Sequence, residues 1–234
     1  MTEKNEWPMR INKFLALKNY STRRGADKLV KEGKVFINGK RASLGDKVSE
    51  KDKVTLKGFE TEKYVYYAYY KPAGVATLAT GKEKAIKDVA NFPETVFPLG
   101  RLDKDSEGLL IMTNDGRLTD KLLNPKFEHE KEYEVTVDRP ITHEFLVKMS
   151  KKVDIGIGKT KESKIRRKNK NTFEIILSEG KNRQIRRMCG VFGYGVKKLK
   201  RFRIMNILIK KLKPNQFRKI SGKEQKDFFK KIGV

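Results

Sequence analysis

This sequence has very little of the residues that build disulfides and transition-metal sites. Its 234 residues include one cysteine, Cys189, and two histidines, His129 and His143. An internal disulfide is therefore excluded, and a structural zinc site lacks its usual ligands. Apolar runs fall far short of the ~18 residues that cross a bilayer, and no signal-peptide core is present. We therefore expect a cytoplasmic protein with no membrane partner and no bound metal.

Acidic residues are also scarce beside basic ones. There are 55 Lys and Arg against 29 Asp and Glu, a formal charge of +26, while 37% of residues are hydrophobic, enough for real cores. The charge is uneven: +7 over 1–60, −1 over 61–130 and +20 over 131–234. A field of this sign attracts polyanions. Basic flanks around a neutral centre fit a protein that grips a nucleic-acid backbone on both sides of a reactive pocket.

The N-terminal part has the pattern of a small module of its own. The apolar spacing from Ile11 to Leu17 predicts a short helix, and Ser21 is placed to cap a second helix that ends at Gly33. A strand over 35–37 then meets Asn38-Gly39, the strongest short hairpin signal. The arginines and lysines of this part are also compatible with a solvated helix face.

Beyond a short linker over 56–63, the periodicity predicts scattered strands and helices. Strands are expected at 64–70, 109–113, 132–138, 172–178 and 203–209, and helices near 84–90, 117–123, 143–151, 182–192 and 222–231. Ser221 and Glu224 have capping-box spacing, and Gly233 lies near the end of the last helix. The strands are too scattered for a repeated βαβ array, so this part is predicted to be α+β.

One segment, GRLDKDSEGLLIMTNDG over 100–116, places three carboxylates at alternate positions close behind an arginine. Asp103, Asp105 and Glu107 match the start of an EF-hand loop, but Asn114 stands at position twelve and β-prone residues follow, which argues against calcium. Two interpretations remain. One of the acids is a catalytic group, or all three have a structural role and pair with neighbouring basic side chains.

A second segment, GKNRQIRRM over 180–188, predicts a docked basic helix. Ile185, Met188, Cys189 and Phe192 form one apolar stripe, and Arg186 flanks it. An arginine at the edge of a buried face can hold a carboxylate ionised or clamp a phosphate. Cys189 lies on the stripe, so we interpret it as a packing residue and not as a nucleophile.

Residues 9–42, MRINKFLALKNYSTRRGADKLVKEGKVFINGKRA, resemble the RNA-binding module named after small-subunit ribosomal protein S-four. The order of pieces is the same: a basic helix, a Ser-x-Arg-Arg helix and a V-x-I-N-G-K hairpin. The resemblance covers about residues 9–56 and implies five residues that face RNA: Arg10, Lys13, Arg23, Arg24 and Lys34.

The rest of the chain resembles the RsuA-like pseudouridine synthases, which carry the same N-terminal module. The resemblance rests on KPAG (71–74), GRLDKDSEGL (100–109), EKEYEV (130–135) and EGKNRQIRRM (179–188). It implies an S-four-type domain over 9–57 and a catalytic domain over 63–234, built on a mixed, mostly antiparallel sheet with flanking helices. A monomer that needs no metal or cofactor is expected.

These enzymes detach uracil from C1′ of the ribose, turn it and rejoin it through C5. The resemblance implies that Asp103 is the essential aspartate, which attacks C1′ or removes a C2′ proton. It further implies that Tyr133 stacks on the flipped base and that Arg186 pairs with Asp103 and keeps it charged. Four further residues are expected at the RNA: Arg101, Lys181, Asn182 and Arg183.

The substrate implied by the resemblance is ribosomal RNA. The segments 129–142, 182–194 and 201–207 are most similar to an enzyme of the branch that acts on large-subunit (23S) ribosomal RNA. Small-subunit ribosomal RNA and transfer RNA are alternative substrates. A non-catalytic RNA-binding factor of ribosome assembly is the competing function, and the joint presence of Asp103, Tyr133 and Arg186 argues against it.

Overall fold

The computed structural model describes residues 7–18, 20–58 and 63–233, and its contacts divide the chain into two compact units. The first unit comprises the described residues up to Val65 together with Asn114–Thr119, and the second comprises Tyr66–Thr113 and the residues from Asp120 onward. Within the described ranges, every helix falls short of the length and hydropathy that a membrane crossing requires.

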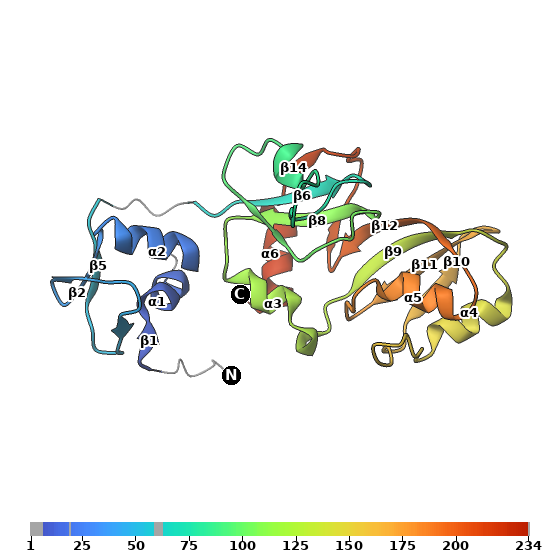
Figure 1. Cartoon of the computed structure of the whole chain (residues 1–234), viewed down its shortest axis with the longest axis horizontal. Helices are drawn as coiled ribbons and strands as arrows, with labels where there is room; N and C mark the ends of the chain where they lie inside the picture. Colours follow the sequence, from blue (N-terminus) through green and yellow to red (C-terminus); the bar gives the residue numbers. More distant parts are fainter. Residues whose placement is uncertain (1–6, 19, 59–62, 234) are drawn as a thin grey trace. The chain divides into compact units, whose positions relative to one another are not determined.

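The first unit is two helices packed on short strands (Figure 1). The elements are β1 (Met9–Arg10), α1 (Ile11–Leu17), α2 (Arg23–Lys31), β2 (Val35–Ile37), β3 (Lys40–Arg41), β4 (Lys47–Val48) and β5 (Val54–Leu56). β2 lies between β3 and β5, and β1 pairs with β4. Its core contains Ile11 and Leu15 of α1, which belong to the predicted apolar spacing, together with Leu29 and Val30 of α2.

The turns of this unit follow from particular residues. Asn38 (φ 50°) and Gly39 (φ 81°) both take positive φ, as the Asn-Gly hairpin requires, and β2 and β3 pair on either side. The expectation that Ser21 caps α2 is wrong, because the Thr22 side chain accepts the hydrogen bond from the Gly25 N–H at 3.0 Å.

The second unit is built on a mixed sheet, mostly antiparallel, which confirms the predicted fold class. Its strands are β6 (Tyr66–Lys71), β7 (Phe97–Leu99), β8 (Glu107–Thr113), β9 (Lys131–Val137), β10 (Lys164–Arg167), β11 (Thr172–Leu177), β12 (Val196–Ile204), β13 (Ile207–Leu208) and β14 (Phe217–Lys219). The order is β10-β11-β9-β12-β8-β6-β14, with β13 beside β12 and β7 beside β8. β12 and β8 run parallel, and the other pairings are antiparallel.

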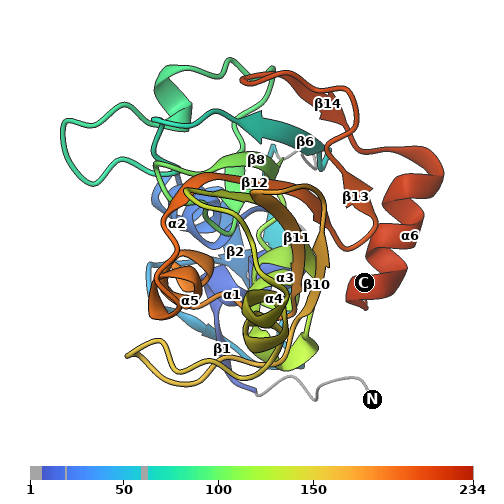
Figure 2. The same cartoon turned by 90° about the vertical axis from the view of Figure 1, so that its right-hand side faces the viewer.

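Helices cover the faces of this sheet. They are η1 (Ile86–Asp88), α3 (Leu118–Leu123, which enters the second unit at Asp120), η2 (Pro125–Phe127), α4 (His143–Ser150), α5 (Gln184–Val191) and α6 (Gly222–Ile232). Figure 2 shows α4 and α5 beside β10 and β11. The core below α4 and α5 joins Val135 of β9, Phe173 of β11, Phe145 of α4 and Met188 and Cys189 of α5. Cys189 is fully buried, as its place on the apolar stripe predicted.

Three expectations need correction. A strand over 203–209 is wrong: β12 already begins at Val196, and Met205 (φ 50°) turns the chain into β13. The lysines of Val196–Ile204 hid the start of this strand, because only one face of it is buried. A helix near 84–90 is reduced to the short η1. Glu224 is engaged with Arg218 and Lys210, so the capping-box prediction is wrong, although Gly233 ends α6 in the left-handed conformation.

Candidate active site

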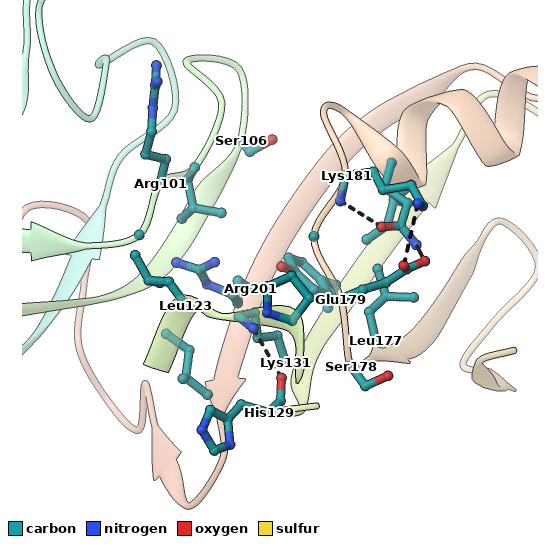
Figure 3. A pocket seen from close by; sticks show the side chains of 18 of the residues that line it. Arg101, Ser106, Leu123, His129, Lys131, Leu177, Ser178, Glu179, Lys181 and Arg201 are labelled. Carbon is teal, nitrogen blue, oxygen red and sulfur yellow. Dashed lines mark hydrogen bonds and ion pairs between the residues drawn. The ribbon is translucent and has the colours of Figure 1, made fainter. Parts of the chain in front are cut away.

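A cleft of about 370 Å³ opens in the second unit between the loop before β8, strands β9 and β12, and the turn before α5. Asp103, Tyr133, Lys181 and Arg183, all singled out from the sequence, line it. Figure 3 shows Arg101 and Ser106 on one side and Glu179 and Lys181 on the other, with Arg201 and Lys131 between them. A half-open cleft with converging charged groups is the usual form of a binding site.

The loop from Gly100 to Ser106, which carries Asp103, is fixed by hydrogen bonds. The Thr77 hydroxyl donates to the Leu102 carbonyl oxygen at 2.7 Å and accepts from the Leu102 N–H at 3.0 Å. The Ser106 N–H donates to the Asp103 carbonyl oxygen at 3.0 Å. The backbone on both sides of Asp103 is thereby held in place, as a preorganised reactive group requires.

Lys71, at the end of β6, is a fully buried cation beside this loop. Its Nζ donates to the carbonyl oxygens of Pro72 (2.8 Å) and Val75 (2.6 Å), and the Gly74 N–H donates to the Lys104 carbonyl oxygen (2.8 Å). Burial lowers the pKa of Lys71 to about 8, against the opposing charges of Asp103, Asp105 and Glu107. The Lys-Pro-x-Gly segment therefore supports the loop that carries Asp103.

The expected pair between Arg186 and Asp103 is not what the structure shows. Arg186 donates to the carbonyl oxygens of Val196 and Asp105, both at 3.1 Å. Arg183 takes the predicted place, with Nη1 3.9 Å from Asp103 Oδ2 and 3.7 Å from Asp105 Oδ2. The reason lies in the backbone: Arg183 is the N-cap of α5 in the left-handed conformation (φ 48°), while Arg186 lies one turn inside the helix.

Tyr133 lies on the face of β9 that turns toward the cleft. It is buried, and its register partner on β12 is Arg201, whose guanidinium carbon is 6.0 Å from the centre of the tyrosine ring. Because side chains alternate along a strand, Lys131 shares this face. One cleft wall therefore carries an aromatic ring and two cations.

The opposite wall is the turn between β11 and α5. The buried Glu179 carboxylate accepts from the Lys161 N–H at 2.8 Å and from the Gln184 amide at 2.9 Å, and Gln184 accepts from the Lys181 N–H at 2.9 Å. These bonds hold the backbone of Lys181 at the cleft. Asn182, by contrast, accepts from Arg187 within the turn.

The RNA-facing residues expected in the first unit differ in their availability. Arg10 ends β1, and Arg23 and Arg24 begin α2; all three side chains are exposed. Lys13 is half-buried on α1. Lys34 is already paired with Glu32 at 2.7 Å, so part of its charge is neutralised within the protein.

Sequence reasoning missed several residues that line the cleft, among them His129, Lys131, Glu179 and Arg201. For Lys131 a signal existed, since it lies two positions before Tyr133 on the same strand face. Arg201 carried no such signal, because its strand was not recognised. Among the residues that the structure describes, no three His, Cys, Asp or Glu side chains are grouped closely enough to hold a metal ion.

Two family models match the chain. One, described as RNA pseudouridylate synthase, matches residues 65–190, and the S4 domain model matches residues 9–54. The first range covers the second unit up to Gly190, and the second range covers both helices and most of the strands of the first unit. The matched range contains the cleft residues from Leu99 to Ile185, whereas the cleft residues of β12 lie beyond it.

Individual relatives agree with the family models. The Escherichia coli K12 protein named dual-specificity RNA pseudouridine synthase RluF is 45% identical over 230 residues, which are 96% of this chain and 79% of the relative. The Bacillus subtilis protein named ribosomal large subunit pseudouridine synthase B is 38% identical over 82% of this chain and 84% of its own. A crystal structure of a pseudouridylate synthase superposes with a TM-score of 0.69 at 25% identity, over 96% of this chain and 99% of its own.

Proposed function

The chain belongs to the RNA pseudouridine synthase family, and we propose that it isomerises a uridine of large-subunit ribosomal RNA with Asp103 as the reacting carboxylate. The observation that carries the proposal is the position of Asp103: it lines the cleft, its loop is fixed by Lys71 and Thr77, and Arg183 lies beside it. Of the three clustered acids, Asp103, Asp105 and Glu107, only Asp103 lines the cleft.

The reaction breaks the bond between C1′ and N1 of the uridine and forms one between C1′ and C5. An ionised carboxylate serves both routes, attack at C1′ and removal of the C2′ proton. Arg183, whose Nη1 is 3.9 Å from Asp103 Oδ2, places a positive charge beside this carboxylate in the cleft. Arg186 acts one step further away, because it holds the Asp105 carbonyl of the same loop.

The target uridine must leave its stack to reach Asp103. Tyr133 offers an aromatic face inside the cleft, and a base that stacks on an aromatic side chain gains ~1–3 kcal/mol. At the rim, Arg101 and Lys181 are positioned for the phosphates on either side of the flipped nucleotide. The exposed Arg10, Arg23 and Arg24 of the first unit supply a second, sequence-independent grip on the backbone.

The choice of RNA rests on the relatives. The Bacillus subtilis relative is named for the large ribosomal subunit, which supports large-subunit ribosomal RNA as the substrate. The Escherichia coli relative is named a dual-specificity enzyme, and this supports a second RNA substrate, for which transfer RNA is the candidate. A monomer is the proposed state, and the cytoplasm, where ribosomal RNA is processed in bacteria, is the proposed location.

Mapping pseudouridines in cells with and without the gene tests this proposal. Loss of one modified position in large-subunit ribosomal RNA, restored by the wild-type gene but not by an Asp103→Asn copy, is the expected result. Transfer RNA from the same cells is mapped in parallel to find the second substrate. Unchanged pseudouridine patterns in both RNA pools would exclude the proposed function. Loss of a modified position in small-subunit ribosomal RNA would mean that this RNA, and not large-subunit RNA, is the substrate.

A further inference from the structure

Two cations that line the cleft, the buried Arg201 and the half-buried Lys131, have few groups to neutralise them. Arg201 is 4% exposed; its Nε donates to the Leu109 carbonyl oxygen at 2.8 Å. Lys131 Nζ donates to the His129 carbonyl oxygen at 3.1 Å. Among the residues that the structure describes, neither forms an ion pair, and the buried Nη2 of Arg201 has no hydrogen-bond partner.

Such an arrangement is costly without an anion. A buried ion that lacks a partner carries a desolvation penalty of several kcal/mol. The penalty is visible in Lys131, because burial, followed by the positive charge of Arg201, lowers its pKa to about 8. His129 supplies no negative charge: its Nε2 donates to the Lys121 carbonyl oxygen at 2.8 Å, and burial lowers its pKa. The two cations are therefore prepared for negative charge that a bound substrate carries or develops.

The depth of the two cations indicates which part of the RNA meets them. Arg101 and Arg183 are exposed at the cleft, where the backbone of a long polymer can pass, whereas Arg201 is buried on the wall that carries Tyr133. A flipped nucleotide places its base deepest and leaves its phosphates outside. Arg201 is also the cross-strand neighbour of Tyr133, the residue proposed to stack on that base.

We propose that Arg201 and Lys131 stabilise the negative charge of the detached uracil. The inference rests on the proposed function. When the C1′–N1 bond breaks, its electron pair stays on N1, and the ring carries a negative charge shared with its carbonyl oxygens. After the ring has turned, C5 supplies the electron pair for the new bond to C1′, while the Asp103–C1′ ester bond breaks or, on the other route, C2′ takes back its proton. The C5 proton is then lost to solvent and N1 takes up a proton. The two cations hold the ring in the cleft between these steps.

This charge exists only after the bond has broken, so the cations act on the rate and not on RNA affinity. Removal of one preorganised donor to a developing anion typically costs ~10²–10³-fold in rate. Arg201→Gln and Lys131→Gln remove the charges, while Arg201→Lys and Lys131→Arg retain them. Arg203→Gln is the matched control: Arg203 is also on β12, but its guanidinium is paired with Glu130 and Glu132 and it does not line the cleft.

The experiment measures tritium release from ribosomal RNA labelled at uracil C5, under single-turnover conditions with enzyme in excess. RNA dissociation constants and melting temperatures are measured for each variant. We expect Arg201→Gln and Lys131→Gln to react ~10²–10³-fold more slowly with RNA affinity within about twofold of wild type. The charge-retaining variants recover much of the rate, and Arg203→Gln stays within about threefold.

Other outcomes separate this inference from the proposed function. If either Gln variant is folded and reacts at the wild-type rate, the charge of that residue does not act on the uracil. If RNA affinity falls while the saturated rate is unchanged, the cations bind a phosphate and the inference is wrong. If Arg201→Gln does not fold, Lys131→Gln decides. Absence of release with wild-type enzyme on any ribosomal RNA would contradict the proposed function itself.

Discussion

Gly108 of β8 lies opposite Arg201 of β12, and a Cβ on Gly108 would come within 2.2 Å of the Arg201 carbonyl oxygen. The contact is made to backbone, so a small side-chain shift cannot relieve it. Gly108 also has φ +112°, a conformation that residues with a Cβ rarely adopt. The close approach places Arg201 of β12 beside the start of β8. Because β8 follows directly after the loop that carries Asp103, the pairing links the cleft residues of β12 to that loop.

Gly108→Ala is therefore expected to lower the free energy of unfolding by about 2 kcal/mol or more, through strain and the separation of β8 from β12. Urea unfolding followed by circular dichroism measures this change. Gly81→Ala is the matched control, because a Cβ there meets nothing within 4 Å. Equal stability of the two variants would mean that β8 and β12 do not approach so closely.

Arg183 and Arg186 are expected to fail in different ways. Arg183→Gln removes the charge beside Asp103 and should lower the single-turnover rate by about tenfold or more, with little change in melting temperature, since the pair is partly exposed. Arg186→Gln removes hydrogen bonds to Val196 and Asp105 and should lower the melting temperature as well as the rate. If Arg186→Gln slowed the reaction and Arg183→Gln did not, Arg186 would be the functional partner of Asp103, as the sequence predicted, and Arg183 would not.

The exposed arginines at the start of α2 are expected to bind the RNA backbone. Arg23→Glu combined with Arg24→Glu should weaken RNA binding and reduce the slope of log affinity against log salt by ~2, one unit for each lost phosphate contact. Filter binding over a range of salt concentrations gives the slope. The matched control reverses two other exposed charges of the same unit, Lys51 and Lys53, between β4 and β5. A similar change in both double variants would indicate a general charge effect and not a specific face.

Cys189 gives a direct probe of the core under α5. Burial raises the pKa of its thiol to about 12, against ~8.5 in an unfolded chain. At pH 8 a thiol reagent should therefore label the chain only after unfolding. As pH rises above ~8.5 the unfolded thiol ionises while the folded one stays protonated, so this thiol's contribution to stability falls toward the folded pKa. Rapid labelling of the native protein at pH 8 would contradict the buried position.

Much of the fold could be predicted from local patterns. The Asn38-Gly39 turn, the apolar spacing of α1 and the stripe of Ile185, Met188 and Cys189 each depend on neighbours in sequence. β12 was placed too late because its exposed lysines break the apolar alternation on one face. The capping of α6 was wrong because Glu224 is drawn to Arg218 and Lys210, a choice that tertiary packing makes.

In the site too, local motifs could be predicted from the sequence, whereas contacts that depend on tertiary structure could not. Asp103, Tyr133 and the basic turn before α5 were recognisable as motifs, and the structure brings them to one cleft. Which arginine faces Asp103 depends on the left-handed backbone at Arg183, which no spacing in the sequence reveals. Arg201 reaches the cleft only through the pairing of β12 with both β8 and β9, two strands far away in the chain.

The central claim is that Asp103 reacts with the uridine. Tritium release from C5-labelled large-subunit ribosomal RNA tests it most directly, with wild type, Asp103→Asn and the neighbouring Asp105→Asn compared under single turnover. We predict that Asp103→Asn releases tritium at least ~10³-fold more slowly than wild type while it still binds RNA, because the carboxylate is the reacting group. Asp105→Asn should stay within about threefold. Release by Asp103→Asn at the wild-type rate would contradict the account.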